Sequence, residues 1–157
     1  MKNNFRFVAL EASEFAAYFE KTDDELAVLG ARRMSVNAQP GFPCRVSLAD
    51  AEVGEEVILL PYGHHAVNSP YRASGPIFVR KAAETAHPEV NEIPAVFRQR
   101  LLSLRGYDRA AMMVFSNVVE GKDLAEALSQ LFENKNIEYI HVHNAKPGCF
   151  GGLVRRV

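Results

Sequence analysis

The chain has 157 residues, of which 48% are hydrophobic and 24% are charged, an ordinary globular composition that indicates neither disorder nor a coiled coil. Its net charge of −1 and pI of about 6.5 give no electrostatic reason to expect nucleic acid or an anionic membrane as a partner. We therefore expect a single domain over residues 1–157, long enough to fold without a metal, cofactor or disulfide.

The first sixty residues predict short strands and helices. Strands are expected at 5–10, 32–37, 44–48 and 57–60, and helices at 13–20 and 23–29. The second helix has the clearer start, because Thr22 and Glu25 have the spacing of a capping box. Residues 57–60 are apolar on both faces, which is typical of a buried central strand.

The middle of the chain is less regular. Residues 61–75 show no periodicity, and we expect a long loop of the kind that is often functional. A strand at 76–80 follows. We then expect a short helix at 94–99 and a strand at 101–107, which pairs as a hairpin with the strand that begins at residue 111.

The C-terminal third contains the strongest helical pattern, at 123–133, where Asp123 and Glu126 resemble a second capping box. A strand follows at 137–143. Strand, helix and strand over 111–143 have the length of a parallel βαβ crossover. The predicted fold is therefore α+β, with a mixed β-sheet of six to seven strands and three to four short helices.

The last predicted strand supplies the main candidate site. Alternate residues of a strand share a face, so His141 and His143 point the same way. Asn144, Lys146 and Cys149 follow directly, and ligands favour the carboxyl ends of parallel strands. We expect a pocket here, with the histidines and Cys149 as candidate catalytic residues and with Asn144 and Lys146 as candidate ligand-binding residues.

Each of these groups has other interpretations. His141 and His143 have the spacing of a metal-binding pair, which Cys149 or Cys44 would complete as a zinc-like site. The two imidazoles are equally compatible with hydrogen-bonded core histidines or with a proton shuttle. No metal is required by the sequence.

Two further segments join the candidate site. Cys44 and Cys149 each follow a Pro- and Gly-containing bend, and a neighbouring cation such as Arg45 or Lys146 favours a reactive thiolate. The alternatives are two inert buried thiols or a redox disulfide between them. Tyr71 and Arg72 lie in the predicted loop, where Arg72 either clamps a carboxylate or phosphate or ties the loop down.

Four segments together resemble a known family: GFPCRVSL at 41–48, SPYRASGPIFVR at 69–80, LSLRGYD at 102–108 and YIHVHNAKPGC at 139–149. They are similar to an uncharacterised bacterial family catalogued as domain of unknown function 1203. The resemblance extends from about residue 5 to residue 149 and implies a small, free-standing bacterial protein. It implies no activity, substrate or cofactor.

Three functions remain open. The first is a small-molecule-binding or enzymatic pocket for a small anionic molecule, with Cys44, Arg45, Tyr71 and Arg72 gathered around the last strand. The second is a non-catalytic homodimer that uses an apolar patch or an edge strand such as 153–157. The third is a metal-binding or thiol-redox protein. Since the chain has two cysteines and no signal-peptide or membrane-length apolar stretch, we expect it in the cytoplasm, with no membrane partner.

Overall fold

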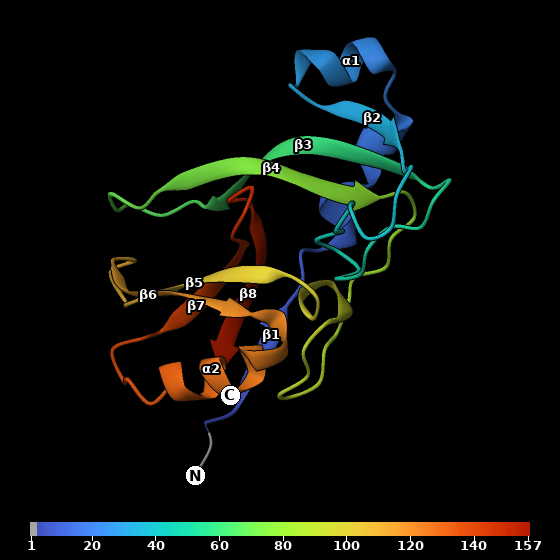
Figure 1. Ribbon diagram of the computed structural model, residues 1–157. Helices are drawn as coiled ribbons and strands as arrows, with labels where there is room; N and C mark the ends of the chain where they lie inside the picture. Colours follow the sequence, from blue (N-terminus) through green and yellow to red (C-terminus); the bar gives the residue numbers. More distant parts are fainter. Residues whose placement is uncertain (1–2) are drawn as a thin grey trace.

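Two antiparallel β-sheets face each other in the computed structural model, which describes residues 3–157 (Figure 1). The large sheet contains, in spatial order, β1 (Phe5–Val8), β8 (Phe150–Arg156), β7 (Tyr139–Asn144), β5 (Leu101–Tyr107) and β6 (Met113–Glu120). The small sheet contains β2 (Arg32–Ser35), β3 (Glu56–His65) and β4 (Ala73–Arg80). Every neighbouring pair in both sheets is antiparallel.

Helices are short in this fold. Residues 3–157 form the α-helices α1 (Asp23–Val28) and α2 (Leu124–Leu131) and the 3₁₀ turns η1 (Ala12–Glu14), η2 (Ala16–Glu20), η3 (Ala95–Phe97) and η4 (Gly121–Asp123). The predicted α+β class, with a mixed sheet and three to four helices, is therefore wrong: the protein is mostly β. The predicted helix at 13–20 is replaced by the short turns η1 and η2, which meet at the buried Phe15.

The predicted parallel βαβ crossover at 111–143 is also wrong, because its two strands are not neighbours in the sheet. β6 and β7 both pair antiparallel with β5, which lies between them. β6 and β7 therefore run in the same direction, but no backbone hydrogen bonds pair them with each other. The cause is the β5–β6 hairpin, which uses one edge of β5 and leaves the other edge for β7. This hairpin was predicted across Asp108 and Arg109, and the structure confirms the pairing with a turn at 108–112.

The outer face of the large sheet is covered by α2, which lies below the sheet in Figure 1. Leu124, Leu128 and Phe132 are fully buried against β5 and β7 residues such as Leu104 and Ile140. This buried apolar face confirms the predicted helix. Truncation of such a buried leucine to alanine typically lowers the free energy of unfolding by about 2–5 kcal/mol. The predicted capping box is wrong, because the Asp123 side chain makes no cap hydrogen bond.

The predicted loop at 61–75 is largely a β-hairpin. β3 continues to His65, and β4 begins at Ala73, with Pro61 opposite Pro76 in the register. Proline has no N–H for a ladder and is tolerated at strand edges. Pairing of β3 with β2 ends at Leu59, so Pro61 lies where one edge of β3 is open.

The segment at 44–48 is a turn, although we predicted a strand. The Leu48 N–H donates to the Cys44 carbonyl at 3.0 Å, and Leu48 has a φ of +53°. Single bridges tie Pro43 to Asp50 and Cys44 to Phe78 of β4. The segment therefore lies alongside the small sheet without extending it.

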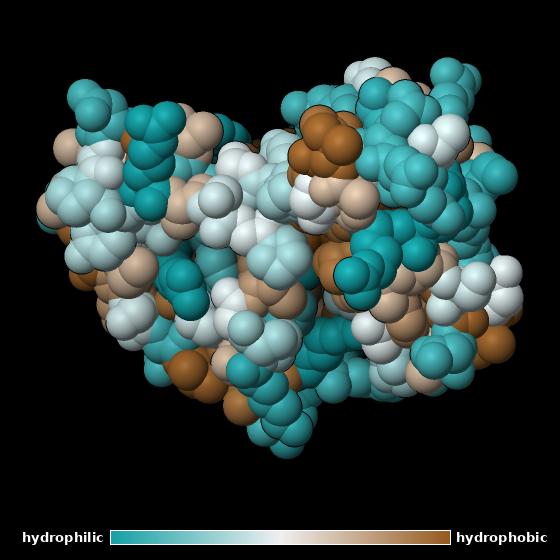
Figure 2. All heavy atoms as spheres, turned by 90° about the horizontal axis from the view of Figure 1, so that it is seen from above, coloured by the Kyte–Doolittle hydropathy of each residue, from teal (hydrophilic) through white to brown (hydrophobic). Residues whose placement is uncertain are grey.

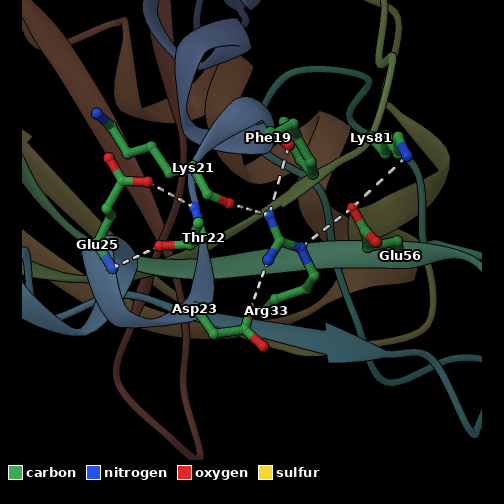
Figure 3. A network of polar contacts seen from close by, with 8 residues as sticks. All are labelled: Phe19, Lys21, Thr22, Asp23, Glu25, Arg33, Glu56 and Lys81. Carbon is green, nitrogen blue, oxygen red and sulfur yellow. Dashed lines mark hydrogen bonds and ion pairs between the residues drawn. The ribbon is translucent and has the colours of Figure 1, made fainter.

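Polar contacts fix α1 against the small sheet (Figure 3). The Thr22 hydroxyl accepts from the Glu25 N–H, and the Glu25 carboxylate accepts from the Thr22 N–H, which confirms the predicted capping box. Arg33 of β2 donates to the Asp23 carboxylate and to the Lys21 carbonyl.

The C-terminal segment is an inner strand. Residues 153–157, expected as an edge strand, belong mainly to β8, which pairs with β1 on one side and β7 on the other. The open edge on the opposite side of the large sheet is β6. Figure 2 views the molecule from the side of the small sheet and shows a mainly hydrophilic surface with scattered hydrophobic residues. Within residues 3–157, no helix has both the length and the apolar character needed to cross a bilayer.

Candidate functional site

A cleft of about 980 Å³ opens between the two sheets. Its walls come from β3 and β4 on one side, from β5, β7 and the start of β8 on the other, and from the segments at 41–45 and 144–149. This volume is in the range of sites that bind small molecules. Residues far apart in the chain meet here because the small sheet is folded over the inner face of the large one.

Four histidine rings form a cluster beside the cleft. His141 and His143 lie on the inner face of β7, and His64 and His65 approach from the end of β3. The ring centroids of His64 and His143 are 5.2 Å apart, and those of His65 and His141 are 4.9 Å apart. Phe150 stacks on His64 with centroids 5.1 Å apart.

Hydrogen bonds orient two of these rings. His143 Nδ1 lies 3.0 Å from the Gly148 carbonyl, so Nδ1 carries the proton and donates it. His65 lies between the Tyr71 carbonyl, at 2.8 Å from Nδ1, and the Tyr139 hydroxyl, at 2.6 Å from Nε2. Of the nitrogens in these two rings, His143 Nε2 is the one without a partner among the described residues.

Three buried imidazole nitrogens have no hydrogen-bond partner within residues 3–157. They are His64 Nδ1, His141 Nδ1 and His143 Nε2. A buried polar atom without a partner costs about 1–3 kcal/mol, and such atoms are uncommon in folded proteins. His64 and His143 are among the residues that line the cleft, so two of these rings lie at its wall.

Burial keeps these rings neutral. Burial is the main cause and, together with the neighbouring histidines and Arg105, it lowers the pKa of His141 to about 2. It also lowers the pKa of His143 to about 4, although the hydrogen bond to Gly148 opposes this shift. The pKa of His64 is lowered for the same reason, mainly by burial. At neutral pH the unpartnered nitrogen of His143 is therefore a hydrogen-bond acceptor.

A buried guanidinium closes the inner end of the cleft. Arg45 is 2% exposed, and its Nε donates to the Phe150 carbonyl at 2.8 Å and its Nη1 to the Pro43 carbonyl. Its Nη2 donates to Cys149 Sγ at 3.3 Å. No carboxylate within residues 3–157 pairs with Arg45. Burial lowers the pKa of Arg45, and the Cys149 sulfur acts in the opposite direction.

The turn between β7 and β8 places Cys149 beside this guanidinium. The Asn144 N–H donates to the Cys149 carbonyl and the Gly148 N–H to the Asn144 carbonyl, at 2.9 and 2.8 Å. Gly148 has a φ of +84°, a conformation that favours glycine. Asn144 Nδ2 also donates to Cys149 Sγ, at 3.5 Å. The sulfur thus accepts from two side-chain N–H groups.

Two more cations line the cleft without carboxylate partners. Within residues 3–157, neither Arg105 of β5 nor Lys146 of the β7–β8 turn forms an ion pair. Arg100 also lines the cleft, but both of its Nη atoms donate to Asp50, at 2.9 and 2.6 Å. Arg105 and Lys146 are therefore the cations available to a ligand.

Three of the predicted site residues lie elsewhere. Cys44 is 1% exposed in the core of the small sheet, where its sulfur accepts the N–H groups of Ser47 and Arg80 at 3.4 Å. Tyr71 and Arg72 are exposed near the end of the β3–β4 hairpin and do not line the cleft. The structure gathers the other predicted residues, with His141 behind the cleft wall: His141, His143, Cys149, Arg45, Asn144 and Lys146.

The zinc-like site considered for His141 and His143 is not supported. Among the described residues, no group of three or more His, Cys, Asp or Glu side chains is arranged to hold a metal ion. One of the ligands considered for this site, Cys44, lies in the separate core of the small sheet. Both cysteines are free thiols, so the considered disulfide is not present.

Sequence reasoning missed two residues of the cleft, His64 and Arg105. The sequence predicts a loop at His64, because residues 61–75 show no periodicity. Arg105 lies directly opposite His141 in the register of β5 and β7. Its alternation with Ser103 and Tyr107 was visible, but only the antiparallel pairing of β5 with β7 places it beside the histidines.

The family comparison covers this entire cleft. The model of the family described as "Protein of unknown function (DUF1203)" matches residues 41–156. The chain belongs to this family. Every residue that lines the cleft falls within the DUF1203 match. The match begins at residue 41, not near residue 5 as expected, and extends beyond the expected boundary at residue 149 to include β8. No curated protein and no solved structure shows a significant match to the chain.

Proposed function

We propose that the cleft between the two sheets binds a small anionic molecule. The observation that carries this proposal is the presence of Arg45, Arg105 and Lys146 in one cleft without a carboxylate partner for any of them within residues 3–157. Arg105 and Lys146 are accessible and would contact the anion, whereas Arg45, buried in the cleft wall, adds positive potential. Unpaired cations in a concave site attract anions more strongly than they do on an open surface.

The neutral histidines define a second requirement for the ligand. His143 Nε2 and His64 Nδ1 are buried and have no partner among the described residues, and both side chains belong to the wall of the cleft. A neutral imidazole with one protonated nitrogen presents an acceptor at the other. The ligand class that satisfies both features is a small carboxylate or phosphate that also carries a hydroxyl or amino group. Asn144 supplies further polar surface at the same end of the cleft.

We also propose that the protein is located in the cytoplasm. Both thiols are free, and a reducing compartment keeps them so. The geometry supports binding without specifying a reaction, because the buried histidines are weak bases at neutral pH.

Calorimetric titration with three anions tests the binding proposal. The probes are malate, succinate, which lacks the hydroxyl of malate, and inorganic phosphate. The Cys149→Ser protein serves as the background, so that thiol chemistry does not contribute. We expect malate to bind more tightly than succinate, because only malate donates a hydroxyl proton to an imidazole nitrogen.

A matched pair of arginine variants provides the control. Arg105→Gln should weaken binding of each anion about tenfold or more, since a hydrogen bond to a charged group contributes about 1.5–3 kcal/mol. Arg109→Gln removes the same charge from the end of the same hairpin, outside the cleft, and should leave affinity unchanged. Equal effects of the two substitutions would contradict a site at Arg105.

Self-association is a second candidate function, and the exposed edge of β6 favours it. Met112, Val114, Phe115 and Val118 are between 37% and 54% exposed on or beside this edge strand. Residues 113–120 contain no lysine, arginine or proline, the residues that commonly protect an edge from pairing. Light scattering tests this: a dimer that Val118→Lys converts to monomer supports the candidate, and a monomeric wild type rejects it.

A further inference from the structure

We propose that Cys149 is a nucleophilic thiol that forms a mixed disulfide with a small anionic disulfide held in the cleft. This inference goes beyond the proposed binding function and uses it in one respect, the preference for negative charge. The modified protein would carry the thiol-derived group inside the cleft, so modification would block access for other ligands.

The contacts of the Cys149 sulfur suit a thiolate. Sγ accepts from Arg45 Nη2 at 3.3 Å and from Asn144 Nδ2 at 3.5 Å. Arg45 is a buried cation, and no carboxylate within residues 3–157 balances its charge. A buried charge is costly unless it is paired, so a negative sulfur at this position compensates the guanidinium. A neighbouring cation of this kind activates cysteines for nucleophilic attack.

An independent feature shows that this part of the cleft is built to receive a ligand. His143 is 1% exposed and lines the same cleft as Cys149. Its Nδ1 donates to the Gly148 carbonyl of the turn that carries Cys149, and its Nε2 has no partner within residues 3–157. A ligand that reaches the sulfur would also meet this acceptor.

Cys44 behaves differently because of its surroundings. Cys44 is 1% exposed in the core of the small sheet, where its sulfur accepts the backbone N–H groups of Ser47 and Arg80. Cys149 is partly exposed. The chain has no third cysteine, so no second thiol is placed to displace the adduct, and the mixed disulfide is the end product.

The reaction is an ordinary thiol–disulfide exchange. The Cys149 thiol releases its proton to solvent, and the resulting thiolate attacks one sulfur of the disulfide. The new bond joins Sγ to that sulfur as the original S–S bond breaks. The other half leaves as a thiolate and takes a proton from solvent. One disulfide is consumed and one is formed, so no external oxidant is needed.

Oxidised glutathione is the probe for this reaction, with intact-mass and peptide-mapping readouts at pH 7. We expect one glutathionyl group per chain, on Cys149. The native rate should exceed that of the same cysteine in the urea-unfolded chain about fivefold, because the Arg45 and Asn144 N–H groups are in place to stabilise the attacking sulfur. Modification of Cys44 before Cys149, or a native rate no higher than the unfolded rate, would overturn the proposal.

Two variants separate activation from folding effects. Asn144→Ala removes one N–H donor to the sulfur and should slow alkylation by neutral iodoacetamide about threefold. Asn136→Ala makes the same change at an exposed site and should leave the rate unchanged. Equal rates for wild type and Asn144→Ala would contradict activation by the amide.

Charge preference distinguishes this inference from the binding proposal. Oxidised glutathione is anionic and cystamine is cationic. For each disulfide, the rate of Cys149 modification in the native protein is divided by the rate in the urea-unfolded chain. We expect a severalfold preference for oxidised glutathione that Lys146→Gln reduces, and no preference would overturn the anionic substrate class. If malate fails to bind but Cys149 is still selectively modified, the binding proposal alone fails.

Discussion

Lowering the pH from 7.5 to 5.0 should destabilise the fold by about 4 kcal/mol through His141 and His143. Both rings are buried, and burial lowers the pKa of His141 to about 2 and that of His143 to about 4, from 6.5. Between pH 6.5 and 5.0 the unfolded chain binds a proton at each ring and the folded chain does not. Protons therefore favour the unfolded state, and stability is lost as the pH falls through this window.

The magnitude follows from the width of the window. From the unfolded value of 6.5 down to pH 5.0, each histidine contributes about 1.4 kcal/mol per pH unit, or about 2 kcal/mol in total. The loss from His143 ends near pH 4, where the folded protein also binds the proton, whereas the loss from His141 continues to lower pH. Above about pH 7.5 neither ring contributes any pH dependence.

Urea unfolding at pH 7.5, 6.5, 5.5 and 5.0 measures this effect. The double variant His141→Gln with His143→Gln has no titrating group at these positions, so its stability should depend on pH much less than that of the wild type. His87→Gln removes an exposed histidine and should preserve the wild-type dependence. The same pH dependence in the wild type and the double variant would refute the argument.

Two further substitutions test the packing around the site. Gly121→Ala should destabilise the fold by several kcal/mol in urea unfolding, because the new Cβ would overlap the Phe97 carbonyl oxygen, whereas Gly63→Ala has nothing within 4 Å and should cost much less. Tyr139→Phe removes the 2.6 Å hydrogen bond to His65 Nε2 and should cost about 1–2 kcal/mol; unchanged stability would show that His65 finds another partner.

The features predicted correctly depend on residues close together in the chain. The shared direction of His141 and His143 follows from strand geometry, and the Thr22–Glu25 capping box involves one turn of helix. The hairpin across 108–112 is equally local. For the same reason the β7–β8 turn could be predicted to carry Asn144, Lys146 and Cys149 together.

The sequence by itself thus determined the local pieces: the direction of the histidines, the turn that follows them and the stripe of α2. Only the tertiary structure decided which strands pair, and the observed pairing contradicts the α+β class. The same pairing places His64 and Arg105 beside His141 and His143. It leaves Cys44 in the core of the small sheet and Arg72 outside the cleft. The physical reason is that turns and side-chain directions are set by a few neighbouring residues. Strand pairing is set by apolar burial and hydrogen bonding summed over the whole chain, and alternating patterns of similar strength do not identify each strand's partner.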